Sequence, residues 1–160
     1  MKIVKGNLID LAEAGDFDII VQGCNCHCTM GSGIAREIRE RYPQAYSADL
    51  ATEQGDYNKL GNYTMAPSSF NSGESKFVIV NAYTQYNFNK NWETRDVFEY
   101  DSFKLILQKL AYLYPTARFG FPMIGMGLAG GNKTRIMGML AEFSLTISES
   151  GGSFTLVEFV

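Results

Sequence analysis

Residues 24–28 bring together the side chains of this sequence that are best suited to chemistry: Cys24, Asn25, Cys26, His27 and Cys28. His27 is the only histidine in the chain. The reference pKa of a histidine, about 6.5, suits a group that positions or deprotonates water near neutral pH. Successive side chains on an extended segment point to opposite sides, so Asn25 and His27 are expected to point the same way. We therefore predict that both are catalytic. The alternative is that His27 is a turn histidine without a catalytic role.

The cysteines are not predicted to hold a metal. A structural zinc site needs four ligands, usually in two separated pairs, and the sequence has no second cluster of cysteines or histidines. Alternate positions of one extended segment do not converge on one ion, and they are too close for an ordinary disulfide framework. We expect buried thiols in a reducing compartment. A cysteine nucleophile near a helix N-terminus is the less favoured alternative, and no cofactor is predicted.

Two glycine-rich loops are predicted to bind phosphate. The apolar run at residues 18–21 is typical of a buried strand, and a helical pattern begins just after the first loop. Glycines let the backbone approach an anion, and the N–H groups of a first helical turn point at it. The second loop follows a later strand, so a diphosphate could lie between the two. The loops consist of Met30, Gly31, Ser32, Gly33 and Ile34, and of Ile124, Gly125, Met126, Gly127, Leu128, Ala129 and Gly130.

Strands and helices that alternate along the chain would position these loops. Strands are expected at residues 2–4, 18–22, 62–66, 77–82, 119–121 and 154–160, and a turn at 6–9. Helices are expected at residues 33–42, at 43–50 with Tyr46 and Leu50 on one face, at 103–114 and from 133 onward. This alternation predicts a single domain, 1–160, with an α/β three-layer (α/β/α) fold and a mixed, mostly parallel sheet of about six strands. Ligands bind at the carboxyl ends of such strands, where both loops fall.

Composition excludes several function classes. The net charge of −3 and the pI near 5.2 argue against broad binding to nucleic acid, which needs a basic face. No apolar stretch approaches the roughly 20 residues that span a bilayer. The first residues lack the basic start and apolar run of a signal peptide. We expect a cytoplasmic monomer without membrane contact and with one core.

Three segments together resemble the macro domain family, which binds ADP-ribose and related nucleotides. They are residues 6–9, 23–35 and 121–128, and the likeness covers nearly the whole chain in the family's order. The Cys24-Asn25-Cys26 corner with the following glycines is most similar to the yeast-type ADP-ribose-1″-phosphate phosphatase. That branch also contains the terminal ADP-ribose glycohydrolases. The resemblance implies the macro-domain fold, with ADP-ribose or ADP-ribose-1″-phosphate as the ligand.

The resemblance also implies how the ligand would lie. The first loop would wrap the distal ribose and its neighbouring phosphate, and the second would cover the diphosphate. Asn25 matches an asparagine that bonds the distal ribose. Asn7 stands where the family usually has an aspartate that accepts the adenine amino group, and the N–H of Leu8 would lie beside it. Phe159, in the last strand, would lie against the adenine.

Gln22 and Asn81 end two strands near the same rim of the predicted sheet. Either side chain could bond the substrate, and either could instead satisfy the backbone of a loop. Gln22 is included among the predicted ligand contacts. Residues 84–95, which carry the only tryptophan, are predicted to form a surface loop, with a lid over the ligand as the alternative.

Two positions depart from the glycohydrolase pattern of the family. That type uses a lysine just after the fourth strand segment and an aspartate in the second glycine loop, where this chain has Thr84-Gln85 and Ala129. These residues cannot form the covalent amine adduct. The lysine-dependent route is therefore expected to be closed unless Lys90 or Lys133 replaces the lysine. Asn7 keeps an oxygen that accepts a hydrogen bond, so adenine binding would be weaker or base preference broader.

The favoured function is hydrolysis of ADP-ribose-1″-phosphate to ADP-ribose and phosphate. The leaving group is a hemiacetal, more acidic than an ordinary alcohol, so backbone N–H groups and a water oriented by Asn25 and His27 could suffice. One alternative is a module that binds free or protein-linked ADP-ribose without turnover. Another is an enzyme for a different ADP-ribose ester or derivative. A Rossmann cofactor domain is disfavoured because the first loop lacks the third spaced glycine and a ribose-binding acid.

Overall fold

The computed structural model describes residues 1–87, 97–127 and 129–160. The strands are β1 (Lys2–Gly6), β2 (Ile19–Cys24), β3 (Tyr63–Pro67), β4 (Val78–Tyr83), β5 (Arg118–Phe121) and β6 (Ser153–Phe159). The helices are α1 (Leu8–Glu13), α2 (Gly33–Arg41), α3 (Pro43–Leu50), α4 (Tyr100–Leu113) and α5 (Lys133–Glu149), with short 3-10 turns η1 (Tyr57–Lys59) and η2 (Ser72–Glu74). Within the described ranges, no helix combines the length and the hydropathy that crossing a membrane requires.

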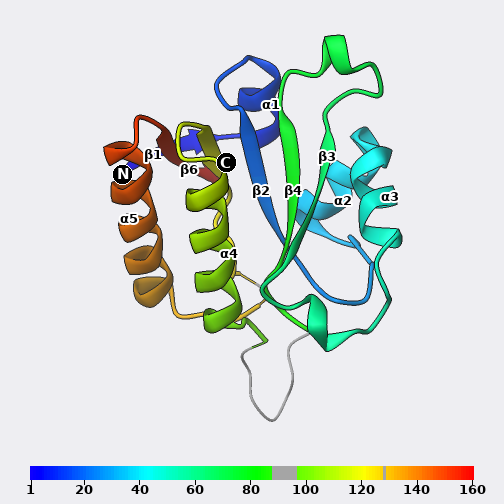
Figure 1. Ribbon diagram of the computed structural model, residues 1–160. Helices are drawn as coiled ribbons and strands as arrows, with labels where there is room; N and C mark the ends of the chain where they lie inside the picture. The colour runs from blue at the N-terminus through cyan, green and yellow to red at the C-terminus, as the bar shows by residue number, and fades with distance from the viewer. Residues whose placement is uncertain (88–96, 128) are drawn as a thin grey trace.

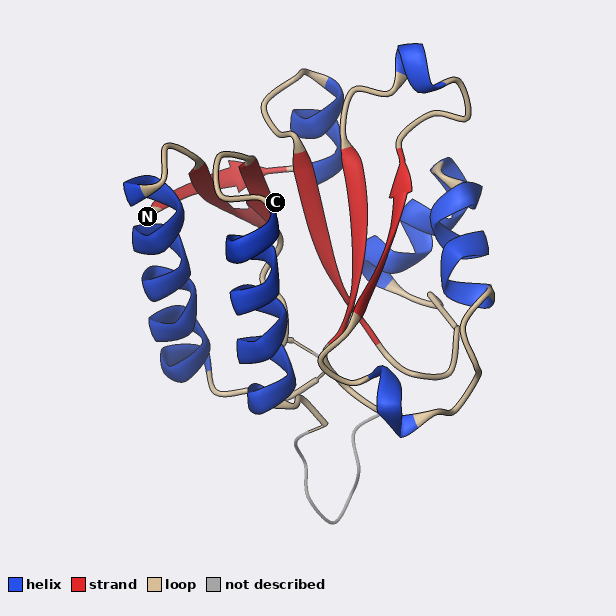
Figure 2. Cartoon of the chain, in the orientation of Figure 1, coloured by secondary structure: helices blue, strands red, loops and turns tan. Residues whose placement is uncertain are grey.

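The strands of this part of the chain form one sheet in the order β1-β6-β5-β2-β4-β3. In it β3 runs antiparallel to β4, and the other neighbouring pairs are parallel. Strand β2 lies at the centre, between β5 and β4, which explains its apolar run on both faces (Figure 2). The prediction of a mixed, mostly parallel sheet of six strands is confirmed.

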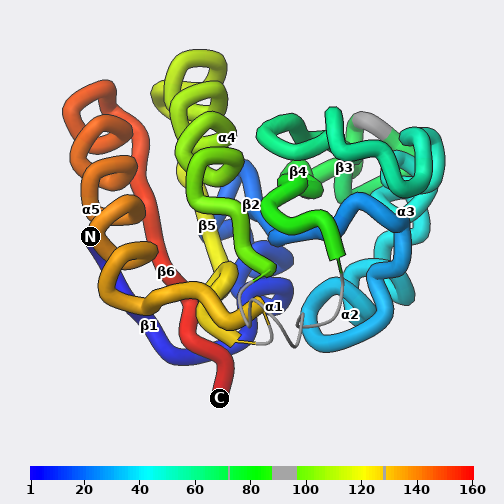
Figure 3. The backbone as a smooth tube through the Cα atoms, turned by 90° about the horizontal axis from the view of Figure 1, so that it is seen from below, coloured from blue at the N-terminus to red at the C-terminus, as the bar shows by residue number. Residues whose placement is uncertain are grey.

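Helices cover both faces of the sheet and complete three layers. Figures 1 and 3 show α4 and α5 side by side on one face, with α2 and α3 on the other. Alternate side chains of β2 follow this division, because Ile19 and Val21 join the core beneath α4 and α5. Ile20 joins the core formed with α1, α2 and α3. The predicted α/β/α arrangement is therefore confirmed.

Two local predictions differ from the structure. Residues 6–9 do not form a simple turn, because Asn7 caps α1: its Oδ1 accepts a hydrogen bond from the Asp10 N–H at 3.0 Å. A helix this short shows no periodicity in the sequence. In α3, the predicted helix is present, but Leu50 of the apolar pair Tyr46 and Leu50 is 53% exposed, while Ala45 and Asp49 are buried. The inner face is thus shifted by one residue, which brings Asp49 inward.

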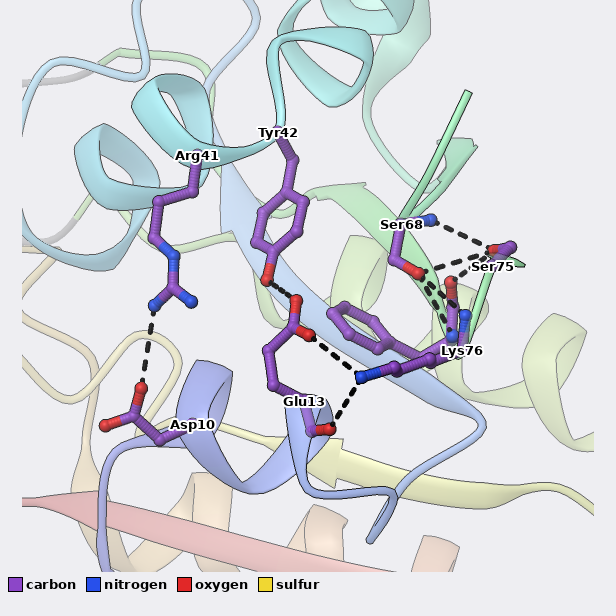
Figure 4. A network of polar contacts seen from close by, with 8 residues as sticks. Asp10, Glu13, Arg41, Tyr42, Ser68, Ser75 and Lys76 are labelled. Atoms are coloured by element: carbon purple, nitrogen blue, oxygen red, sulfur yellow. Dashed lines mark hydrogen bonds and ion pairs between the residues drawn. The ribbon is translucent and has the colours of Figure 1, made fainter. Parts of the chain in front are cut away.

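A polar network fixes the end of the sheet where β2 and β4 begin (Figure 4). The hydroxyl of Tyr42, just after α2, donates to Glu13 of α1. Lys76, before β4, lies with its Nζ 3.7 Å from the Glu13 carboxylate, and Arg41 lies 3.6 Å from Asp10. These contacts tie α1 to the end of α2 and to the β3–β4 connection. The network therefore lies at the opposite end of the sheet from the carboxyl ends of the strands, where the glycine loops are.

Candidate functional site

A cavity of about 720 Å³ lies at the carboxyl ends of the central strands. Both glycine loops line it, the first through residues 30–35 and the second through Met123, Gly125, Gly127 and Ala129. The end of β2 forms part of its wall. The structure therefore brings the two loops to one place, as their positions after parallel strands predict. The remaining lining residues are Gly23, Cys24, Asn25, Thr29, Asp49 and Gln85.

Asn25 shapes the first loop from within. Its Oδ1 accepts a hydrogen bond from the His27 N–H at 2.8 Å, and its Nδ2 donates to Thr29 Oγ1 at 2.7 Å. The loop then passes through left-handed backbone at Cys28 (φ 59°) and Met30 (φ 40°). Each such non-glycine residue costs roughly 1–2 kcal/mol, so the surrounding contacts must hold it in place. This turn leads residues 30–35 along the cavity.

Asn25 and His27 differ in what surrounds them, and the expectation that they point the same way stays a prediction. Strand β2 ends at Cys24, and beyond it Cys26 and Cys28 are buried while Asn25 and His27 are half-buried. Asn25 lines the cavity, whereas His27 is not among its lining residues. The His27 ring instead packs edge to face against Tyr86, with ring centroids 4.7 Å apart. A catalytic role for His27 stays a prediction, and the geometry places only Asn25 at the cavity.

Cys24 at the end of β2, and Cys26 and Cys28 in the turn that follows, are buried, free thiols. Cys24 lines the cavity, and burial raises its pKa well above the ordinary value, with the charge of Asp49 adding to the effect. Burial likewise raises the pKa of Cys26 to about 11. Both therefore stay protonated near neutral pH, which argues against a nucleophilic thiolate and for the expected buried thiols.

The second loop is packed tightly behind its cavity-facing surface. Gly125 has a φ of +77°, and a Cβ placed on it would lie 2.6 Å from the Phe98 ring. Its carbonyl accepts a hydrogen bond from the Gly131 N–H at 2.7 Å. Ile124 packs onto β2, where a Cβ on Gly23 would come within 2.9 Å of its Cγ2. Of the predicted contacts in this loop, Ile124, Met126 and Gly130 are not among the lining residues, and Leu128 lies outside the described residues.

Three predicted adenine contacts lie away from the cavity lining. Asn7 uses its Oδ1 to cap α1, and Leu8, the first residue of α1, is 3% exposed and belongs to the hydrophobic core. Phe159, on β6, is 75% exposed. These residues are not part of the cavity wall, so their contact with a base stays a prediction.

Gln22 and Asn81 form a buried amide pair between β2 and β4. Both side chains are fully buried, and Gln22 Nε2 donates to Asn81 Oδ1 at 2.9 Å. Asn81 Nδ2 donates in turn to the Ala45 carbonyl and to Thr64 Oγ1, both at 3.0 Å. The pair thus ties α3 and β3 to the centre of the sheet. The structure does not bring either side chain into the cavity lining.

The two departures from the glycohydrolase pattern fall at the cavity. Gln85 and Ala129 line it, while Thr84 beside Gln85 is fully buried. In the described part of the lining there is no lysine, arginine or histidine. Lys133 is the exposed first residue of α5 and is not in the lining; Lys90 lies outside the described residues.

Asp49 is a site residue that the sequence analysis missed. It lies near the end of α3, is 1% exposed, and lines the cavity. Its Oδ1 accepts a hydrogen bond from the Tyr83 hydroxyl at 2.8 Å. Burial raises the pKa of Asp49, and the Tyr83 hydroxyl and the Lys59 charge act in the opposite direction. The available signal was its i, i+4 spacing from Ala45, which shares its buried face.

Comparison with known proteins gives a relative in a bacteriophage. No protein-family model matches the chain. The chain is 34% identical over 151 residues, 90% of each sequence, to an "uncharacterized 17.5 kDa protein in tk-vs intergenic region" of Enterobacteria phage T4. The chain belongs to the family of that phage protein.

Solved structures identify the fold. A Bacteroides thetaiotaomicron protein of unknown function superimposes with a TM-score of 0.76 at 19% identity, over 99% of this chain and 98% of the other. The macrodomain of Mycobacterium tuberculosis DarG gives 0.71 at 19%, over 97% and 96%. Thermosipho africanus DarTG, solved in complex with ADP-ribose, gives 0.73 at 11%, over 99% of this chain and 42% of that one. The chain therefore has the macrodomain fold, as the resemblance implied.

Proposed function

We propose that the protein binds ADP-ribose derivatives in the cavity between its glycine loops and hydrolyses ADP-ribose-1″-phosphate. The observation that carries this proposal is the meeting of both loops in one cavity of about 720 Å³ at the carboxyl ends of the strands. That volume lies within the range of small-molecule sites. Macrodomain-fold structures of Thermosipho africanus DarTG and of a Trypanosoma brucei macrodomain were solved in complex with ADP-ribose, which supports the ligand class.

The diphosphate would be held by backbone groups. The lining includes the first residues of α2, whose N-terminal N–H groups and helix dipole favour an anion. The described lining offers no cationic side chain, so backbone N–H groups would supply the attraction. Glycines at positions 31, 33 and 127 line the cavity, and a Cβ at each would meet no protein atom within 4 Å, so these positions leave room for the ligand.

Asn25 is the predicted catalytic residue that the cavity geometry supports. Its side chain lies at the end of β2, where the distal ribose is expected. There it would orient the ribose or the attacking water. Water attacks phosphorus, the bond from phosphorus to O1″ breaks, and the hemiacetal oxygen leaves with the electron pair and takes a proton. His27, which packs against Tyr86 and is not among the lining residues, is given no step in this mechanism.

A non-catalytic ADP-ribose module is the second candidate. The observation in its favour is the uncharged lining at the two positions where the glycohydrolases have a lysine and an aspartate, here Gln85 and Ala129. Such a cavity could hold ADP-ribose without providing the amine chemistry. Hydrolysis of another ADP-ribose ester is the third outcome that a substrate panel would reveal.

The test is direct. Purified protein without added metal is incubated with ADP-ribose-1″-phosphate, and phosphate release is followed by ³¹P NMR; calorimetry measures ADP-ribose affinity on the same sample. Asn25→Ala should reduce turnover, whereas Asn71→Ala, an exposed asparagine in the β3–β4 connection, should not. ADP-ribose binding without phosphate release would favour the module, and an acetyl ester substrate would then test the third outcome. Absence of both binding and turnover would overturn the proposal.

A further inference from the structure

Asp49 is the one carboxylic acid among the cavity-lining residues that the structure describes. It reaches the cavity because α2 starts at the first glycine loop and runs back along the sheet, and α3 then returns toward the carboxyl ends of the strands (Figure 1). Cys24, the other titratable residue in that lining, stays a neutral thiol because burial raises its pKa. Asp49 is thus the side chain available to exchange a proton with a ligand.

Several contacts hold Asp49 in place. Oδ1 accepts the hydrogen bond from Tyr83, whose hydroxyl also lies 3.1 Å from Thr64 Oγ1. The Asp49 carbonyl accepts from Thr52 Oγ1 at 2.6 Å and from Cys28 Sγ at 3.2 Å. The residue is therefore anchored both to β4 and to the first loop. Because Oδ1 is engaged by a donor, the proton of the neutral acid belongs on Oδ2.

The surroundings support both protonation states of this carboxyl group. Burial favours the neutral acid and raises its pKa, and the negative charge of a bound phosphate would raise it further. The groups around it are Cys24 of β2, Cys28 of the first loop, Tyr83 of β4 and Lys59 of η1. The Lys59 ammonium, 7% exposed and 5.0 Å from the Tyr83 ring centre, favours the carboxylate, as does the Tyr83 hydroxyl. These two groups would stabilise the base that remains after a proton is given away.

We propose that Asp49 is the general acid of the site and donates its proton to the leaving oxygen of the phosphate ester. This inference rests on the proposed hydrolysis. The bond from phosphorus to O1″ breaks, its electron pair moves to O1″, and O1″ takes the proton from Asp49. Water forms the new bond to phosphorus and releases its own proton to solvent, from which the Asp49 carboxylate is later reprotonated. General acids of this kind contribute typically about 10²–10⁴-fold to the rate.

The experiment compares Asp49→Asn with the wild type and with Asp16→Asn, the same change at an exposed residue before β2. Asparagine keeps the size and the acceptor for Tyr83, but its amide N–H is not acidic enough to transfer a proton to the leaving oxygen. We expect kcat of Asp49→Asn to fall by about 10²-fold, with ADP-ribose affinity retained. The wild-type kcat, measured as a function of pH, should fall as pH rises through the raised pKa of Asp49, and Asp16→Asn should follow the wild type.

The outcomes separate this inference from the proposed function. A wild type that releases phosphate while Asp49→Asn keeps its kcat overturns the role of Asp49 and leaves the hydrolysis standing. A wild type that binds ADP-ribose without turnover overturns the hydrolysis and the step assigned to Asp49 together. If Asp49→Asn does not fold, Tyr83→Phe replaces it. The Tyr83 hydroxyl lowers the pKa of Asp49, so its removal should raise that pKa and move the fall in kcat to higher pH. An unchanged pH profile would refute the inference.

Discussion

Replacing Gly125 by alanine should destabilise the protein strongly through the second glycine loop. The residue has a φ of +77°, and left-handed backbone costs a residue with a side chain roughly 1–2 kcal/mol. The new Cβ would lie 2.6 Å from the Phe98 ring and 3.0 Å from Ile136 Cδ1, and overpacking of this kind costs about 1–3 kcal/mol. The two effects sum to about 2–5 kcal/mol, a large share of the roughly 5–15 kcal/mol that stabilises a typical domain.

Urea unfolding with ADP-ribose calorimetry is the assay. The matched control is Gly127→Ala, in the same loop and the same cavity lining, where a Cβ meets no atom within 4 Å. Its stability should stay within about 0.5 kcal/mol of the wild type, and any change in its ADP-ribose affinity reports the methyl group in the cavity. Equal unfolding midpoints for the two variants would refute the reasoning about strain and packing at Gly125.

Three further predictions concern single charged or titratable groups. Hydrogen bonds from Arg118 lower the pKa of Asp18, so above pH ~4 the free energy of unfolding of Asp18→Asn should be about 0.5–1 kcal/mol below that of the wild type. In urea unfolding this difference should vanish as pH falls through the folded-state pKa of Asp18. Burial raises the pKa of Asp49 in the folded protein, so ionisation of Asp49 opposes folding once pH exceeds its pKa in the unfolded chain, about 3.9. At pH 7 the melting temperature of Asp49→Asn should therefore be no lower than that of the wild type, and a lower one would contradict this reasoning. Because His27 is not in the cavity lining, His27→Ala should keep most of the phosphate-release activity, and a loss of tenfold or more would restore it to the mechanism.

Regular elements with long apolar patterns were predictable from the sequence. Helix α5 shows why: Ile136, Leu140 and Phe143 form its buried face, and the Asn132 side chain accepts from the Arg135 N–H at 2.9 Å as a cap. Each of these signals is local and repeated, so one of them can fail without loss of the prediction. Helix α1 has six residues and one cap, which is too little periodicity to distinguish it from a turn.

The site was predictable in its backbone and less so in its side chains. Glycine loops after parallel strands must meet at one edge of the sheet, and they do. The direction of a side chain depends on where a strand stops and on the register of a helix. Asn25 and His27 both follow the end of strand β2, and only Asn25 lines the cavity. A shift of one position in α3 exchanges Leu50 for Asp49 on the buried face.

These two features, backbone recognition of phosphate and a buried acid, are physically connected. A cavity that attracted phosphate with lysine or arginine side chains would also attract a proton away from a neighbouring carboxyl group, because nearby positive charge lowers the pKa of an acid. The described lining has no such side chain, and Lys59 is placed behind Tyr83 and Cys28 with its Nζ donating to the Cys26 carbonyl at 2.9 Å. Peptide N–H groups attract the anion through partial charges, and the electrostatic effect of these charges falls off within about one turn of helix. Backbone recognition of the phosphate therefore adds no cationic side chain that would lower the pKa of Asp49, and this favours the protonated state that a general acid requires.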